Sequence, residues 1–129
     1  MSPMVTPLYA GFLALLFIAL ATRVIQHRKS ARISTGDGGD PALNKKMRVQ
    51  ANCAEYAPVG LILLLLAELQ GAPGWALHLL GATLLLGRLA HAAGMGATPQ
   101  RINLRVFGMM LTLAMIAIAA LGNIAHALL

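Results

Sequence analysis

The sequence predicts an all-α fold: a polytopic membrane four-helix bundle with both termini on the non-cytoplasmic side. Four long apolar stretches, at roughly 4–25, 51–69, 75–95 and 106–128, each approach the ~20 residues with which a helix crosses ~30 Å of hydrocarbon. Of the 129 residues 58% are hydrophobic and 11% charged, which excludes an ordinary soluble domain. All ten Lys and Arg residues would lie on one side of such a bundle, and the positive-inside rule makes that side cytoplasmic.

Four spanning helices use most of the chain, so we expect a single domain over 1–129, with helices at about 4–32, 44–69, 75–95 and 101–128. The first helix continues past the membrane surface, since nothing breaks it before Ser34. No basic region precedes its apolar part, so it is not expected to be a cleaved signal peptide.

The segment Ser-Thr-Gly-Asp-Gly-Gly-Asp-Pro at 34–41 predicts a flexible loop. Either Asp40 or Asn44 is then expected to cap the second helix. Gln-Gly-Ala-Pro-Gly at 70–74 predicts a tight turn, which makes the second and third helices an antiparallel hairpin. The third helix ends in a Gly- and Pro-containing segment at 94–99, and the fourth runs to the C-terminus.

Several other residues have structural expectations. The net charge of +6 lies in a juxtamembrane loop and at helix ends, without interleaved aromatic residues. Membrane topology and attraction to anionic lipid are therefore its expected roles, and nucleic acid is not an expected partner. No His, Cys and carboxylate cluster has zinc spacing, so no metal site is expected. Cys53 is expected to serve packing, and Glu68 to be a solvated helix end. Asn123 and His126 are expected to form interhelical or interfacial hydrogen bonds. Close helix packing compatible with a trimer is expected at the small residues Gly81, Gly87, Ala90 and Gly94.

The second helix carries the residues that suggest chemistry. Arg48, Asn52 and Glu55 are spaced four and three apart, so they share one helix face. An ionised carboxylate at hydrocarbon depth costs on the order of 2.5–3.5 kcal/mol, so Glu55 needs a cationic partner, and Arg48 is the nearest in sequence. Pro58 should bend the helix just beyond them. The spacing alone leaves open a structural ion pair that locks helices together.

The segment Arg48-Val49-Gln50-Ala51-Asn52-Cys53-Ala54-Glu55-Tyr56-Ala57-Pro58 closely resembles the second-helix signature of the MAPEG family, the membrane-associated proteins in eicosanoid and glutathione metabolism. Arg88-Leu89-Ala90-His91 and Arg105-Val106-Phe107-Gly108-Met109 are similar to patterns of its bacterial members. The order of four helices, a long basic first loop and a short second loop extends the resemblance over essentially the whole chain.

The resemblance implies a homotrimer in the bacterial inner membrane, with the basic loops cytoplasmic and glutathione bound between adjacent subunits. It assigns glutathione contacts to Arg28, Arg48, Gln50, Asn52, Glu55, Tyr56, Arg88 and His91. By this resemblance Glu55 pairs with the α-amino group of glutathione and Arg48 with a carboxylate. Arg105 matches the catalytic arginine beside the glutathione sulfur, where a guanidinium lowers the thiol pKa and favours the thiolate.

The sequence also departs from the family's eicosanoid enzymes. Where those enzymes carry tyrosines in the third helix, this chain has His91 and Met95. The loop before the fourth helix differs in length, so Arg101 remains an alternative to Arg105. These differences favour a general glutathione transferase, with or without peroxidase activity, that joins glutathione to a hydrophobic acceptor from the bilayer.

Two other classes of function remain open. A non-catalytic lipid- or glutathione-binding scaffold would not need the full set of Arg48, Glu55 and Arg105. A small multidrug exporter of similar length would carry an essential carboxylate in its first helix, and the first helix of this chain has no acidic residue.

Overall fold

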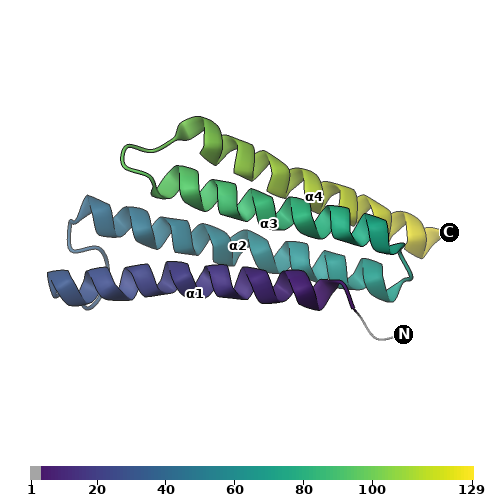
Figure 1. Cartoon of the computed structure of the whole chain (residues 1–129), viewed down its shortest axis with the longest axis horizontal. Coiled ribbons are helices and arrows are strands. Elements are labelled where there is room, and N and C mark those ends of the chain that lie inside the picture. Colours follow the sequence, from purple (N-terminus) through teal and green to yellow (C-terminus); the bar gives the residue numbers. More distant parts are fainter. Residues whose placement is uncertain (1–3) are drawn as a thin grey trace.

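The computed structural model of the chain describes residues 4–129 and consists of four long helices. These are α1 (Thr6–Ala31), α2 (Pro41–Leu69), α3 (Gly74–Gly96) and α4 (Ile102–Leu128). They lie side by side with alternating direction, so the start of α1 and the end of α4 meet the α2–α3 turn at one end, and the two longer loops lie at the other (Figure 1). All four are long and apolar enough to cross a membrane, which confirms the predicted fold class. Which end faces the cytoplasm stays a prediction.

The start of α2 is the largest difference from the predicted helix ends. The helix begins at Pro41, so the predicted start at 44 is too late. The side chain of Asp40 accepts hydrogen bonds from the backbone N–H groups of Ala42 and Leu43, at 3.0 and 3.3 Å. Proline is well suited to the first helical position because its missing N–H would have no intrahelical partner there. Asp40 is therefore the cap, and Asn44 lies inside the helix.

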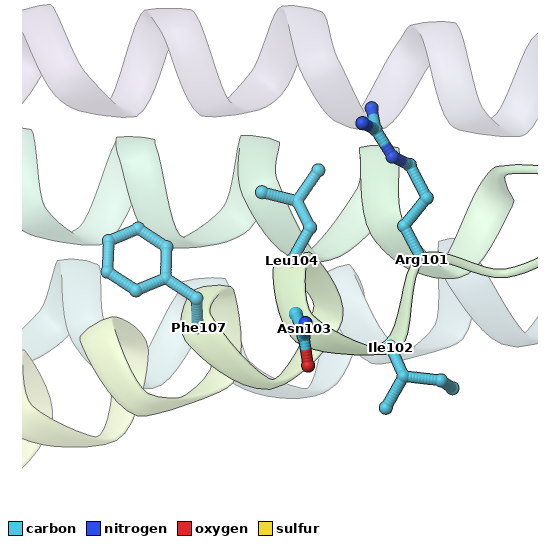
Figure 2. Close-up of a pocket in the computed structure, with 5 residues that line it drawn as sticks. All are labelled: Arg101, Ile102, Asn103, Leu104 and Phe107. Carbon is cyan, nitrogen blue, oxygen red and sulfur yellow. The ribbon is translucent and has the colours of Figure 1, made fainter.

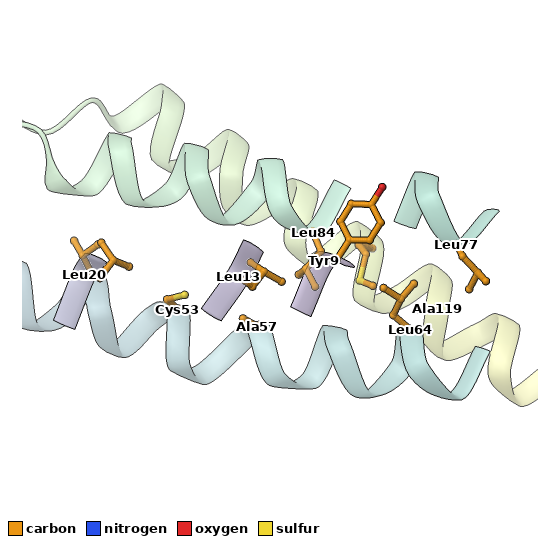
Figure 3. Close-up of a cluster of buried hydrophobic side chains, with 11 residues drawn as sticks. Tyr9, Leu13, Leu20, Cys53, Ala57, Leu64, Leu77, Leu84 and Ala119 are labelled. Carbon is orange, nitrogen blue, oxygen red and sulfur yellow. The ribbon is translucent and has the colours of Figure 1, made fainter. Parts of the chain in front are cut away.

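The core is a strip of apolar side chains between the helices (Figure 3). It includes Tyr9, Leu13 and Leu20 from α1, Cys53, Ala57 and Leu64 from α2, Leu77 and Leu84 from α3, and Ala119 from α4. Cys53 is buried and packs in this strip, as predicted. Large apolar side chains also cover the outside of the bundle, as a hydrocarbon environment favours.

Helices α3 and α4 approach most closely where glycines stand. A Cβ atom at Gly94 would collide with the backbone nitrogen of Arg105, and one at Gly108 would collide with the backbone nitrogen of His91. Likewise a Cβ at Gly87 would lie 2.8 Å from the Thr112 hydroxyl. Gly87 and Gly94 thus serve packing inside one chain, and their presence carries no argument for a trimer.

The end of the bundle that holds the α2–α3 turn is tied together by polar contacts. Glu68 accepts the backbone N–H groups of Met4, Val5 and Thr6, each at 2.8 Å. Glu68 lies at the end of α2 and is half-buried, so it is a helix end as expected. The expectation missed its partner, because its carboxylate satisfies the open N–H groups at the start of α1. Asn123 Nδ2 donates to the carbonyl of Leu63 at 3.1 Å, which confirms the predicted interhelical bond.

Candidate functional site

Arg48 and Glu55 form the predicted pair on α2. Arg48 Nη2 lies 3.6 Å from Glu55 Oε1, and the two side chains are 54% and 57% exposed. Both residues belong to the same helix, so within one chain this pair does not lock two helices together. Exposed ion pairs contribute little to stability because solvent screens them. The pair thus leaves a cation and an anion, seven residues apart on one helix, open to a ligand.

The other motif residues divide between two sides of α2. At about 100° per residue, Asn52, Glu55 and Tyr56 fall within about 100° of one another on the side of Arg48. Gln50 falls about 160° from Arg48 by the same geometry. Gln50 is half-buried, like Asn52 and Tyr56. One subunit therefore does not present Gln50 and Arg48 to the same small ligand.

An open groove of about 510 Å³ begins at Arg48. It is lined by Pro41, Ala42, Asn44, Lys45, Arg48, Met95, Thr98 and Gln100, and we call it the loop-end groove. Lys45 Nζ donates to the carbonyl of Ala97 at 2.7 Å and to the Thr98 hydroxyl at 2.8 Å. This contact ties the α3–α4 loop to α2 at the groove.

Arg105 is connected to the loop-end groove by its contact with Gln100, a residue that lines the groove. Its Nη1 donates to the side-chain oxygen of Gln100 at 3.0 Å, and Arg105 is half-buried in the first turn of α4. Because Gln100 also lines the groove with Arg48, residues from α2 and α4 converge at one end of the bundle. Gln100 thus links the two predicted residues: it contacts Arg105 and lines the same groove as Arg48.

Arg101 lies in a different place. It is the exposed residue that precedes α4, and its side chain makes no capping hydrogen bond. It lines a separate hollow of about 690 Å³ with Ile102, Asn103, Leu104 and Phe107. Figure 2 shows the Arg101 guanidinium pointing away from the side on which Ile102 lies. None of the predicted glutathione-binding residues lines this hollow.

Arg88 and His91 are buried rather than presented at the surface; each is 2% exposed. Arg88 Nε donates to the Thr112 hydroxyl at 3.0 Å, and Arg88 Nη1 donates to the backbone and side-chain oxygens of Asn52. The Arg88 guanidinium also lies 5.3 Å from the centre of the Tyr56 ring, within the range of a cation–π contact. Arg88 therefore connects α3 to two motif residues of α2.

Arg28 is held at the α1–α2 loop. Its Nη1 donates to the carbonyl of Gly36 at 2.7 Å, and its Nη2 lies 3.5 Å from the sulfur of Met47. It lines a hollow of about 450 Å³ with Ile25, Lys29, Arg32, Ile33 and Ser34. This hollow shares no residue with the loop-end groove, so Arg28 and Arg48 line different hollows of one subunit.

The same loop carries a chain of three charged or titratable groups. His27 Nε2 lies 2.8 Å from Asp40 Oδ2, and Lys46 Nζ lies 3.0 Å from His27 Nδ1. The hydrogen bond from His27, followed by those from the backbone at Leu43 and Ala42, holds the pKa of Asp40 below its ordinary value. These contacts fasten the end of α1 to the start of α2.

The residues that sequence patterns did not identify are Gln100, in contact with Arg105, and Lys45, which anchors the α3–α4 loop. Gln100 carries no motif signal, since its role depends on how the loop turns before α4. The positive charge of Lys45 was evident from the sequence, but its partners in the α3–α4 loop, Ala97 and Thr98, were not. Among residues 4–129, no group of His, Cys, Asp and Glu gathers in a way that would hold a metal ion.

Comparison with known proteins identifies the family of the chain. The profile of the MAPEG family matches residues 6–125. Inner membrane protein YecN of Escherichia coli strain K12 is 40% identical over 91 residues, which cover 70% of each chain. Leukotriene C4 synthase of Bos taurus is 32% identical over 106 residues, which cover 81% of this chain and 70% of that enzyme. The chain is therefore an integral, multi-pass membrane protein that belongs to the MAPEG family.

Proposed function

We propose that the protein is a membrane-embedded glutathione transferase that joins the glutathione thiolate to hydrophobic electrophiles from the bilayer. The observation that carries the proposal is the open Arg48–Glu55 pair beside the loop-end groove. Glutathione has carboxylates for an arginine and an α-amino group for a carboxylate, so it complements both charges of the pair. The similarity to leukotriene C4 synthase points to the same substrate.

We further propose that the site lies between adjacent copies of a homotrimer. Gln50 faces nearly opposite to Arg48 on α2, and Arg28 lines a hollow separate from the groove of Arg48. If all three contact one glutathione, then Arg28 and Gln50 come from one subunit and Arg48, Asn52, Glu55 and Tyr56 from its neighbour. The similarity to YecN, an inner membrane protein, supports a location in the bacterial inner membrane.

In the proposed reaction Arg105 acts on the thiol. A guanidinium beside the sulfur stabilises the thiolate, and the partial positive charge at the start of α4 acts in the same direction. The thiol proton leaves to solvent, the thiolate sulfur forms a bond to an electrophilic carbon, and the leaving group departs with its electron pair. Positioning and the lowered thiol pKa then supply most of the rate enhancement.

Isothermal titration of glutathione into detergent-purified protein, followed by an assay with an aryl halide, tests the proposal. We expect binding and turnover in the unmodified protein and weaker binding in Arg48→Ala and Glu55→Gln, because each leaves a charge unpaired. Arg23→Ala, which removes an exposed arginine of α1, is the control and should bind normally. Unchanged affinity in both site variants would remove the proposed site, and binding without turnover of aryl halide or peroxide would favour a scaffold.

A further inference from the structure

Arg88 is a buried cation for which the structure shows no acidic partner. The ion pairs among residues 4–129 are His27–Asp40 and Arg48–Glu55, and neither includes Arg88. Its guanidinium instead contacts neutral groups: the Thr112 hydroxyl, the two oxygens of Asn52, the sulfur of Met109 and the face of Tyr56. A buried charge without a counter-charge is costly, and a neutral side chain would fill the same space at lower cost.

The contact with Arg88 fixes which way the Asn52 amide points. A guanidinium has only donors, so the Asn52 atom that it meets must be the oxygen Oδ1. The amide NH₂ group is then the part of Asn52 left for other partners. Asn52 is half-buried, whereas Arg88 is 2% exposed, so Asn52 stands between the buried guanidinium and the face of α2 that holds Arg48 and Glu55.

We propose that Arg88 is a positioning residue that holds Asn52 as a hydrogen-bond donor toward the bound ligand. The ligand group at Asn52 must then be an acceptor. If the proposed function holds, on which this part rests, that acceptor is a carboxylate or amide carbonyl of glutathione. Arg88 acts through Asn52 and through the Tyr56 ring, and does not itself touch the substrate.

The substitution Asn52→Asp separates this role from a purely structural one. Aspartate keeps the oxygen that Arg88 requires and supplies a counter-charge, so the variant should fold and melt at or above the temperature of the unmodified protein. It has no NH₂ group to donate, so its affinity for glutathione should fall about tenfold or more. Asn52→Ala should lose both stability and affinity. A stable Asn52→Asp protein that binds glutathione normally would overturn the inference.

A change at Arg88 itself gives a second test. Arg88→Gln should raise the KM for glutathione about tenfold and leave kcat at saturating glutathione nearly unchanged, because Asn52 is misplaced and Arg105 is not. In the Asn52→Asp background the same change should raise KM little further. A fall in kcat with unchanged KM would contradict the assignment, and if Arg88→Gln does not fold, the Asn52→Asp result decides.

The arrangement can also be tested apart from glutathione. A double-mutant cycle of Arg88→Gln and Asn52→Ala, read by thermal unfolding, should show coupling, because the second change costs little once the first has removed the contact. If the unmodified protein binds no glutathione, the proposed function fails together with the donor role, while coupling still upholds the contact of Arg88 with Asn52. Strictly additive effects would refute that contact.

Discussion

Glu68 Oε1 accepts the backbone N–H of Thr6 at 2.8 Å, so the last turn of α2 caps the first turn of α1. Val5, the residue before α1, has no side chain that could serve as a cap. The carboxylate of Glu68 thus does for α1 what Asp40 does for α2, but from a different helix. It also fixes how α1 and α2 align along the bundle.

The first prediction concerns this cap. Glu68→Ala should destabilise the protein by about 0.5–2 kcal/mol, the usual cost of removing a cap, and should speed hydrogen exchange at the amides of Val5 and Thr6. Glu68→Gln keeps one carbonyl oxygen and should have an intermediate effect. Hydrogen exchange measured by mass spectrometry on detergent-solubilised protein provides the test, and unchanged exchange in Glu68→Ala would show that the cap does not form.

The second prediction concerns the close approach of α3 and α4. Gly94→Ala places a methyl group against the backbone of Arg105, where the neighbouring atoms cannot rotate away. We expect a loss of about 1–3 kcal/mol in unfolding free energy, together with displacement of Arg105 and lower turnover.

The matched control for Gly94→Ala is Gly11→Ala. A Cβ at Gly11 meets nothing within 4 Å, and Gly11 also lies inside a helix. Here alanine should be neutral or stabilising by up to about 1 kcal/mol, because it restricts the unfolded chain and favours the helix. Equal melting temperatures for the two variants would show that α3 and α4 do not pack as closely as described.

The third prediction concerns pH. The hydrogen bond from His27 lowers the pKa of Asp40 from its ordinary value of 3.8. A carboxyl whose pKa is lower in the folded than in the unfolded state stabilises the protein fully at pH above the unfolded-state pKa. That stabilisation is lost as the pH falls through the folded-state pKa. Below pH 3.8 the melting temperature of Asp40→Asn should therefore fall less steeply with decreasing pH than that of the unmodified protein. Melting curves for both proteins between neutral and acid pH make the comparison, and parallel curves would contradict it.

The fourth prediction concerns assembly. Native mass spectrometry in mild detergent should show three copies of the 13.5 kDa chain. When Arg48→Ala and Gln50→Ala chains are co-expressed, some adjacent pairs keep Arg48 on one subunit and Gln50 on the next. Glutathione binding should then partly return, although each variant alone binds poorly. No recovery in mixed trimers, or a monomer that turns over glutathione, would contradict a site between subunits.

The sequence was informative wherever one helix determines the geometry. The four apolar stretches predicted the four helices because spanning length is set by the bilayer, and the spacing of Arg48 and Glu55 predicted their contact because helical period is fixed. Three contacts between separate elements were not predictable: those of Arg88 with Asn52, of Glu68 with the start of α1, and of Gln100 with Arg105. They depend on how separate helices and loops approach one another, which no local spacing records.

The last prediction separates thiol activation from glutathione binding. If Arg105 stabilises the thiolate, then Arg105→Leu should lower turnover roughly ten- to a hundred-fold, the rate equivalent of a charge-assisted hydrogen bond. Its effect on glutathione affinity should be much smaller, because Arg48 and Glu55 still hold the ends of the ligand. The ultraviolet absorption of the bound thiolate should appear at higher pH in this variant, because loss of the neighbouring positive charge raises the pKa of the thiol.

Arg101→Leu is the matched control, because it removes an arginine four residues away that lines a different hollow. We expect it to leave both turnover and the thiolate band nearly unchanged. Gln100→Ala should produce a partial loss, because Arg105 then loses the side-chain partner that orients it at 3.0 Å. If Arg101→Leu abolishes activity and Arg105→Leu does not, the thiol lies on the other side of the α4 N-terminus. If neither changes turnover, arginine does not activate the thiol in this protein.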